Sequence, residues 1–294
     1  MSRKTTLPVA LIQERAIIDQ GAGNADANLS VIEARVAEAA RQGAKLVLLQ
    51  ELHNGAYFCQ HESVDEFDLA ESIPGPSTER LAALAKQHKI VVVSSLFERR
   101  AAGLYHNTGV VFDADGSTAG KYRKMHIPDD PGFYEKFYFT PGDIGFKPID
   151  TSVGRLGLLV CWDQWYPETA RAMMLQGAEV LMYPTAIGTE PHDDSLDTAE
   201  PWRRAMQGHA VSNVVPVVGA NRIGHEQVTE AGQTFYGHSF IADHRGDLVE
   251  SLGRDEEGVL VHEFDLDFLD RHRAAWGFFR DRRTDLYGPL LGTR

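Results

Sequence analysis

Three residues of this chain have side chains that could act together in a covalent reaction: Glu51, Lys124 and Cys161. A cysteine attacks as its thiolate, although the reference pKa of a thiol is about 8.5. A nearby ammonium group stabilises the thiolate, and a carboxylate can accept the thiol proton. This combination of groups suits nucleophilic attack on a carbonyl carbon.

The same residues also suit the later steps of a hydrolysis. After the attack, negative charge develops on the carbonyl oxygen, and the Lys124 ammonium and the backbone N–H of Trp162 could both be aimed at it. Glu51 would then serve as acid to the departing amine and as base to the hydrolytic water. The expected chemistry is therefore cleavage of a carbon–nitrogen bond through a thioester.

Each of the three residues lies at the end of an apolar run. Glu51 follows KLVLLQ, Lys124 lies just past a strand expected at 118–122, and Cys161 ends LGLLV. A side chain at the end of a buried strand emerges at the edge of its sheet, where loops form a pocket. Taken singly, the thiol could be structural, the carboxylate a strand-end group and the lysine part of a solvated basic run. Only the combination indicates a site.

Short apolar runs alternate with amphipathic segments throughout the chain. Helices are predicted at 24–42, after Ser77 as an N-cap, from Pro167, and at about 200–213. Turns are predicted at 113–116 and 243–246. Helices separate the early strands and hairpins link the later ones, a pattern typical of mixed sheets covered by helices. Strands are predicted at 7–13, 45–50, 90–96, 107–112, 118–122, 156–160, 180–183, 214–221, 235–242 and 259–264.

Composition narrows the classes of protein. The chain has 294 residues, 43% of them hydrophobic, and no linker or repeat, so one domain over 1–294 is expected. Its net charge of −13 repels phosphate backbones and anionic lipid, which excludes nucleic acid and membrane as expected partners. Two cysteines without a CxxC pair, and the lack of a long apolar segment, favour a cytoplasmic protein.

No cofactor is expected. The 12 histidines are scattered without the spacing of a metal site, so no metal is predicted. The sequence has neither of the two glycine-rich phosphate loops, and it has no GxSxG elbow of a serine hydrolase.

The segments LVLLQE, YRKMHIP and LLVCWDQWYPE resemble, in this order, the glutamate, lysine and cysteine signatures of the nitrilase superfamily. The resemblance extends over essentially the whole chain, and it implies a four-layer α-β-β-α sandwich with two central mixed β-sheets. It also implies a second glutamate after the lysine. Glu135 matches that residue and would position the lysine or the nucleophile. In related proteins the tail, here about 266–294, helps to build oligomers, so a homodimer or larger homo-oligomer is expected.

Longer segments, among them KMHIPDDPGFYEKFYFTPGD and PTAIGTEPHDD, resemble one branch of that superfamily. Its members hydrolyse N-carbamoylputrescine to putrescine, carbon dioxide and ammonia. The resemblance therefore implies a small cationic carbamoyl substrate for this chain.

A physical argument favours the same kind of substrate. The loop AIGTEPHDD contributes Glu190, Asp193 and Asp194. An enzyme for carbamoyl amino acids would need an arginine for the carboxylate, whereas three carboxylates suit an ammonium group. We expect Glu190 to bind the distal ammonium of the substrate. Tyr57 and Phe133 are expected to pack along its butyl chain.

Other interpretations stay open at this stage. The acidic loop could be a solvated face, and the same fold could serve a β-ureidopropionase, another carbamoyl-amino-acid amidase, an aliphatic amidase or a nitrilase. Arg203 and Arg204 are interpreted as structural ion-pair partners, although arginines would suit a carboxylate-bearing substrate. A non-catalytic binding module is a third class, which the intact trio of reactive groups disfavours.

Overall fold

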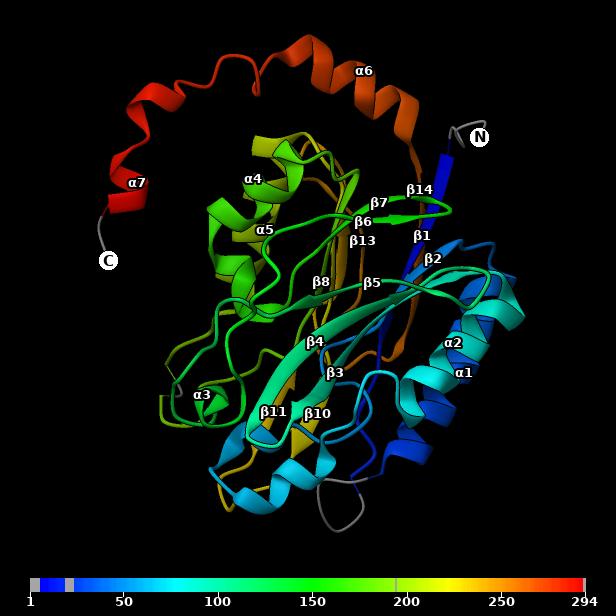
Figure 1. Cartoon of the computed structure of the whole chain (residues 1–294), viewed down its shortest axis with the longest axis vertical. Coiled ribbons are helices and arrows are strands. Elements are labelled where there is room, and N and C mark those ends of the chain that lie inside the picture. The colour runs from blue at the N-terminus through cyan, green and yellow to red at the C-terminus, as the bar shows by residue number, and fades with distance from the viewer. Residues whose placement is uncertain (1–5, 19–23, 194, 293–294) are drawn as a thin grey trace.

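The computed structural model describes residues 6–18, 24–193 and 195–292. Two six-stranded sheets form its centre, and helices cover the outer face of each sheet (Figure 1). Both sheets contain parallel and antiparallel neighbours. The predicted four-layer α-β-β-α sandwich of mixed sheets is thus confirmed.

The first sheet has the strand order β14-β1-β2-β3-β4-β5. β1, β2 and β3 are parallel because helices α1 (Ala25–Arg41) and α2 (Pro76–His88) connect them, whereas the other neighbours are antiparallel. The strands of this sheet are β1 (Thr6–Gln13), β2 (Leu46–Leu48), β3 (Val91–Ala101), β4 (Leu104–Phe112), β5 (Thr118–Arg123) and β14 (Gly258–Asp265).

The second sheet has the order β13-β12-β9-β8-β7-β6. Its parallel strands β7, β8 and β9 are connected by α4 (Pro167–Leu175) and α5 (Ala199–Asn213). A separate hairpin pairs β10 (Ile223–Glu226) with β11 (Gln233–Tyr236). The strands of the second sheet are β6 (Ile149–Thr151), β7 (Gly154–Leu158), β8 (Val180–Pro184), β9 (Val217–Ala220), β12 (Phe240–Ala242) and β13 (Leu248–Ser251).

Alternation along the strands creates the layers. Leu11 of β1 packs between the sheets with Leu158, while Ile12 packs on the outer face with Val36 of α1. The sheets approach closely where β4 carries Gly109. A Cβ at that position would lie only 2.7 Å from Cδ2 of Leu158.

Two local predictions are wrong. The predicted strand at 235–242 is two strands in different sheets, because Gly237 and His238 adopt φ values of 58° and turn the chain. Helix α2 begins at Pro76, and its N-cap is Gly75 rather than Ser77. Ser77 lies in the first turn, where its hydroxyl donates to Glu71. The predicted turns at 113–116 and 243–246 do join β4 to β5 and β12 to β13.

The remaining elements are short or terminal. The C-terminal segment leaves the sandwich as α6 (Leu266–Trp276) and extends over one end of the molecule as an arm that ends in α7 (Pro289–Gly292) (Figure 1). No helix in the described ranges is long and apolar enough to cross a membrane. The other short helices are η1 (Phe58–Gln60), η2 (Val64–Leu69), α3 (Glu135–Tyr138), η3 (Cys161–Trp165) and η4 (Thr284–Leu286).

Candidate active site

The three reactive residues follow strands of both sheets. Glu51 lies in the loop after β2, and Lys124 comes directly after β5. Cys161 begins the turn η3, three residues beyond the end of β7, in a left-handed backbone conformation with a φ of 42°. Such a conformation is uncommon for a residue other than glycine and often marks a functional position.

Lys124 bridges the two predicted carboxylates. Its Nζ lies 2.9 Å from Oε1 of Glu51 and 2.6 Å from Oε2 of Glu135, and all three side chains are buried. Burial alone would lower the pKa of Lys124, but the charges of Glu135 and Glu51 raise it well above its usual value. The lysine therefore stays an ammonium group, as the predicted chemistry requires.

Glu135 is held by a second donor. The hydroxyl of Tyr57 donates to its Oε1 over 2.7 Å. Burial is the main reason that the pKa of Glu135 is raised, to about 7, and the charge of Glu51 adds to the increase. Two buried carboxylates thus share one ammonium, and Glu135 binds its proton more tightly than an ordinary glutamate.

The thiol of Cys161 lies within the electrostatic reach of all three groups. Burial raises its pKa well above the usual range, Glu51 raises it further, and Lys124 opposes the increase. Its Sγ lies 3.9 Å from the backbone oxygen of Ala186. The resting sulfur is therefore a neutral thiol, and its reaction needs a base nearby.

The carboxylate of Glu51 has one oxygen available to act as this base. Its Oε1 accepts hydrogen bonds from Lys124 and, over 2.7 Å, from Nδ2 of Asn107. Its Oε2 is buried and has no hydrogen-bond partner within the described part of the chain. One carboxylate oxygen is fully engaged, and the other is free to accept a proton.

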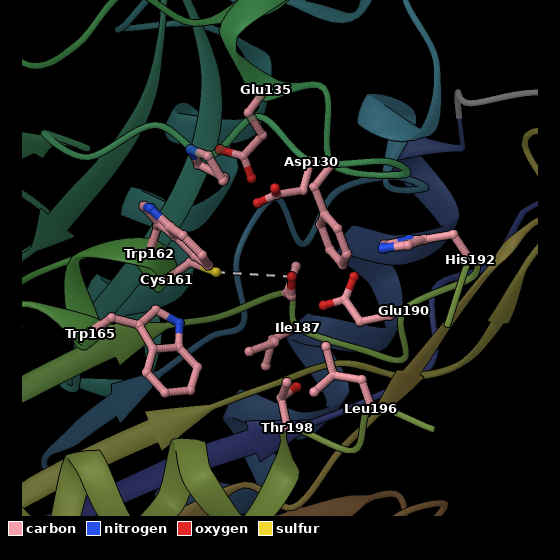
Figure 2. Close-up of a pocket in the computed structure, with 13 residues that line it drawn as sticks. Asp130, Glu135, Cys161, Trp162, Trp165, Ile187, Glu190, His192, Leu196 and Thr198 are labelled. Atoms are coloured by element: carbon pink, nitrogen blue, oxygen red, sulfur yellow. Dashed lines mark hydrogen bonds between the residues drawn. The ribbon is translucent and has the colours of Figure 1, made fainter. Parts of the chain in front are cut away.

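A cavity of about 300 Å³ opens above the thiol (Figure 2). Phe133 and Glu190 line it, together with Cys161, Glu135 and Trp162. Trp162 is the second residue of η3, where an amide N–H has no acceptor within its own helix. The other lining residues are Pro128, Asp130, Trp165, Ala186, Ile187, His192, Leu196 and Thr198.

The wall opposite the two tryptophans is acidic. Figure 2 shows the carboxylates of Asp130 and Glu190 across the cavity from Trp162 and Trp165. Burial raises the pKa of Glu190, His192 opposes this increase, and the charges of Asp130 and Asp193 add to it. Of the described residues that line the cavity, none is a lysine or an arginine. This wall therefore favours a cationic group over an anionic one.

Some predicted residues lie elsewhere. Tyr57 does not line the cavity, because its side chain is fully buried behind Glu135 between Phe133 and Phe235. The expectation that it packs along the substrate is therefore corrected. Asp194 lies outside the described residues.

The two arginines on α5 do not line the cavity. The interpretation of Arg203 as an ion-pair partner agrees with its contact to Glu200, one turn earlier in the same helix.

Sequence reasoning missed three residues that shape this site. Asp130 lies in the segment KMHIPDDPGFYEKF, but a carboxylate in such a loop gives no local signal of where it points. Asn107 is in a strand and contacts Glu51 across the sheet. Arg222 donates to the backbone oxygens of Glu51 and Leu52 over 2.9 and 2.8 Å, and so fixes the loop that carries the glutamate.

Metal ligation finds no support in the arrangement of side chains. Throughout residues 6–18, 24–193 and 195–292, no three His, Cys, Asp or Glu side chains gather where they could hold a metal ion. His126 is engaged by Asp163, with Nδ1 and Oδ1 2.7 Å apart, and His209 lies 2.7 Å from the backbone oxygen of Gln164.

Known proteins are similar to this chain in both sequence and fold. The N-carbamoylputrescine amidase of Solanum lycopersicum is 52% identical over 269 residues, which cover 90% of this chain and 89% of that protein. The citrullinase of Francisella tularensis is 44% identical, with 90% and 92% covered. A crystal structure of a carbon-nitrogen hydrolase from Helicobacter pylori has a TM-score of 0.91 at 44% identity, covering 97% of this chain and 98% of that one. The sequence model of the carbon-nitrogen hydrolase family matches residues 8–274, and the chain belongs to this family, within the nitrilase superfamily.

Proposed function

We propose that the chain hydrolyses N-carbamoylputrescine to putrescine, carbon dioxide and ammonia. Cys161 is the nucleophile, Glu51 the general base and acid, and Lys124 the electrostatic clamp. The observation that carries the proposal is a buried thiol, close to an ammonium and two carboxylates, at the floor of a cavity with an acidic wall. The plant relatives that bear the name of this activity, at about half identity, support the choice of substrate.

The first half of the reaction forms a carbamoyl thioester. Free Oε2 of Glu51 takes the thiol proton, and the sulfur attacks the ureido carbonyl carbon. The oxygen gains negative charge, which the Lys124 ammonium and the Trp162 N–H stabilise. Glu51 returns the proton to the terminal nitrogen, the carbon–nitrogen bond breaks, and ammonia leaves.

The second half consumes one water. Glu51 removes a proton from this water as it attacks the thioester carbonyl, and the sulfur leaves with a proton from Glu51. The product is the carbamate of putrescine, which loses carbon dioxide to give the free amine. Glu135 holds the Lys124 ammonium in place for both halves, through the hydrogen bond of 2.6 Å between Nζ and its Oε2.

The far end of the substrate meets the acidic wall. With the carbamoyl group at Cys161, the distal ammonium lies toward Glu190 and Asp130, and Phe133 covers part of the butyl chain. Two carboxylates from separate loops then compensate one ammonium. Asp130 is thus a second recognition residue beside Glu190.

A panel of four substrates tests this choice: N-carbamoylputrescine, N-butylurea, N-carbamoyl-β-alanine and citrulline. Ammonia release and product identity are measured for each. We expect the highest kcat/KM for N-carbamoylputrescine, a lower value for neutral N-butylurea, and the lowest values for the two carboxylate-bearing compounds. A higher kcat/KM for either carboxylate-bearing compound would overturn the assignment.

We further propose a single-domain, cytoplasmic homo-oligomer. The C-terminal arm supports assembly, because Trp276, Leu286, Leu290 and Leu291 are exposed large apolar side chains. The free thiols of Cys59 and Cys161 support a reducing compartment. Light scattering of the purified chain tests the assembly, and a monomer at micromolar concentration would contradict it.

A further inference from the structure

Asn107 lies fully buried on β4 and touches both partners of the central ion pair. Its side-chain Nδ2 donates to Oε1 of Glu51 over 2.7 Å, and its backbone oxygen accepts from the N–H of Lys124 over 2.9 Å. It does not line the cavity. These two hydrogen bonds go to the reactive groups themselves.

The orientation of the Asn107 amide is fixed from behind. The hydroxyl of Ser95 on β3 accepts from the N–H of Leu52 over 3.4 Å, so its one proton is free to be donated to Oδ1 of Asn107, 2.9 Å away. With Oδ1 engaged as the acceptor, the NH₂ group must point at the carboxylate of Glu51. Ser95 is fully buried as well, and water does not compete for these bonds.

The result is an asymmetric carboxylate. Oε1 of Glu51 receives two donors, Asn107 and Lys124, while buried Oε2 has no partner among the described residues. A buried acceptor without a partner is costly and calls for an explanation. Lys124 alone would not enforce this state, because its ammonium is shared with Glu135 and the carboxylate could rotate to offer it either oxygen.

We propose that Asn107 is a positioning residue that keeps Oε1 of Glu51 engaged and thereby leaves Oε2 to exchange the proton with Cys161. This inference rests on the proposed function, since it assigns the proton transfer to Glu51. It adds that the orientation of the base is set by a neutral amide on β4 and by the Ser95 hydroxyl behind it.

Asn107→Leu, which has nearly the same shape but no donor, is the direct test. We expect kcat to fall roughly 30-fold and KM to stay within about threefold, because Asn107 is not part of the cavity lining that surrounds the distal end of the substrate. The acidic limb of the kcat/KM profile should move to higher pH, since the carboxylate loses a hydrogen bond that favours its charged form.

Thr108→Val is the matched control. Thr108 follows Asn107 on the same strand, is equally buried, and donates to Glu98 over 2.6 Å instead of Glu51. Both variants should lose thermal stability, but only Asn107→Leu should shift the acidic limb. An unmoved acidic limb in Asn107→Leu, or an equal movement in Thr108→Val, would overturn the proposal.

Ser95→Ala keeps the test decisive if Asn107→Leu does not fold. It leaves the amide in place but removes the donor that orients it, so the acidic limb should move in the same direction by a smaller amount. An unmoved limb in this variant would contradict the proposal. Cys161→Ala separates this role from the proposed function. If Cys161→Ala is inactive while Asn107→Leu and Ser95→Ala keep the wild-type pH profile, the proposed function stands and the positioning role of Asn107 fails.

Discussion

The floor of the cavity is formed by Cys161 and Glu135, and Glu135 is bonded through Lys124 to Glu51 behind it. Glu51, Lys124 and Glu135 are fully buried, and their hydrogen bonds are 2.6 to 2.9 Å long. At the mouth, Glu190 is only partly buried, and Asp130 faces the same space from a different loop. Reactive groups need fixed distances, which buried and mutually hydrogen-bonded side chains supply. Recognition of a charged end tolerates looser geometry, because electrostatic attraction acts over several ångströms.

This contrast predicts that substitutions at the floor mainly lower kcat and stability, whereas substitutions at the mouth mainly change the preference among substrates. Four experiments address the contrast, from the largest expected effect to the smallest.

Replacement of the nucleophile should have the largest effect. Cys161→Ala is expected to lower kcat by about 10⁴-fold or more, because no other group can form the thioester. Binding of N-carbamoylputrescine, measured by calorimetry, should persist because the acidic wall is intact. Cys59→Ala is the control, since Cys59 is the other buried thiol and does not line the cavity. More than trace hydrolysis by Cys161→Ala would contradict the mechanism.

Removal of the ammonium should damage both activity and stability. Lys124→Met leaves two carboxylates buried without their cation, and we expect the free energy of unfolding to fall by about 3–5 kcal/mol. The variant should also lose about 10³-fold in kcat, as expected for the loss of an oxyanion donor. Urea denaturation and steady-state kinetics measure the two effects.

Lys121→Met provides the comparison for this variant. Lys121 is bonded to Glu98 over 2.9 Å, but its side chain is 34% exposed, so its loss should cost no more than about 1 kcal/mol. Equal losses of unfolding free energy in the two variants would show that the buried ion pairs of Lys124 contribute no more to stability than the partly exposed pair of Lys121.

At the mouth, Glu190→Gln should change selectivity. Loss of a charge-assisted contact is expected to lower kcat/KM for N-carbamoylputrescine roughly 10- to 100-fold, mainly through KM. The value for N-butylurea, which has no ammonium, should hardly change. Asp193→Asn is the control, because this exposed aspartate of the same loop does not line the cavity. An unchanged KM for the cationic substrate in Glu190→Gln would remove Glu190 from recognition.

The smallest effect is expected on the pH dependence of the free energy of unfolding, through His53 in the loop that carries Glu51. Burial, together with the charge of Arg222, lowers the pKa of His53 from 6.5 to about 3. As the pH falls, the His53 imidazole therefore takes up a proton in the unfolded chain at a higher pH than in the folded chain. The free energy of unfolding consequently decreases as the pH falls from 6.5 toward 3. At pH 5.5 the loss is about 1.4 kcal/mol.

His53→Phe tests this expectation, because neither ring nitrogen has a hydrogen-bond partner beyond its own residue in the described part of the chain. When the pH is lowered from 8 to 5.5, the wild type should lose about 1.4 kcal/mol of unfolding free energy relative to the variant. A pH-independent difference would show that the loop around Glu51 admits water.

Much of the fold could be predicted from local patterns. The helix predicted at 24–42 is α1, and the strand predicted at 7–13 is β1, because long runs with a clear period leave few alternatives. The strand predicted at 235–242 failed because Gly237 and His238 turn the chain inside an apolar run. The four-layer arrangement itself came from the resemblance to a family and not from the periodicity.

The sequence by itself determined that a thiol, an ammonium and a carboxylate end three separate strands, because apolar runs reveal strands and their ends are local features. Only the tertiary structure decided that Tyr57 supports Glu135 from behind, that Asp130 joins Glu190 at the mouth, and that one oxygen of Glu51 stays free. These outcomes depend on side chains that meet across sheets and loops. No local pattern encodes the direction in which such side chains point.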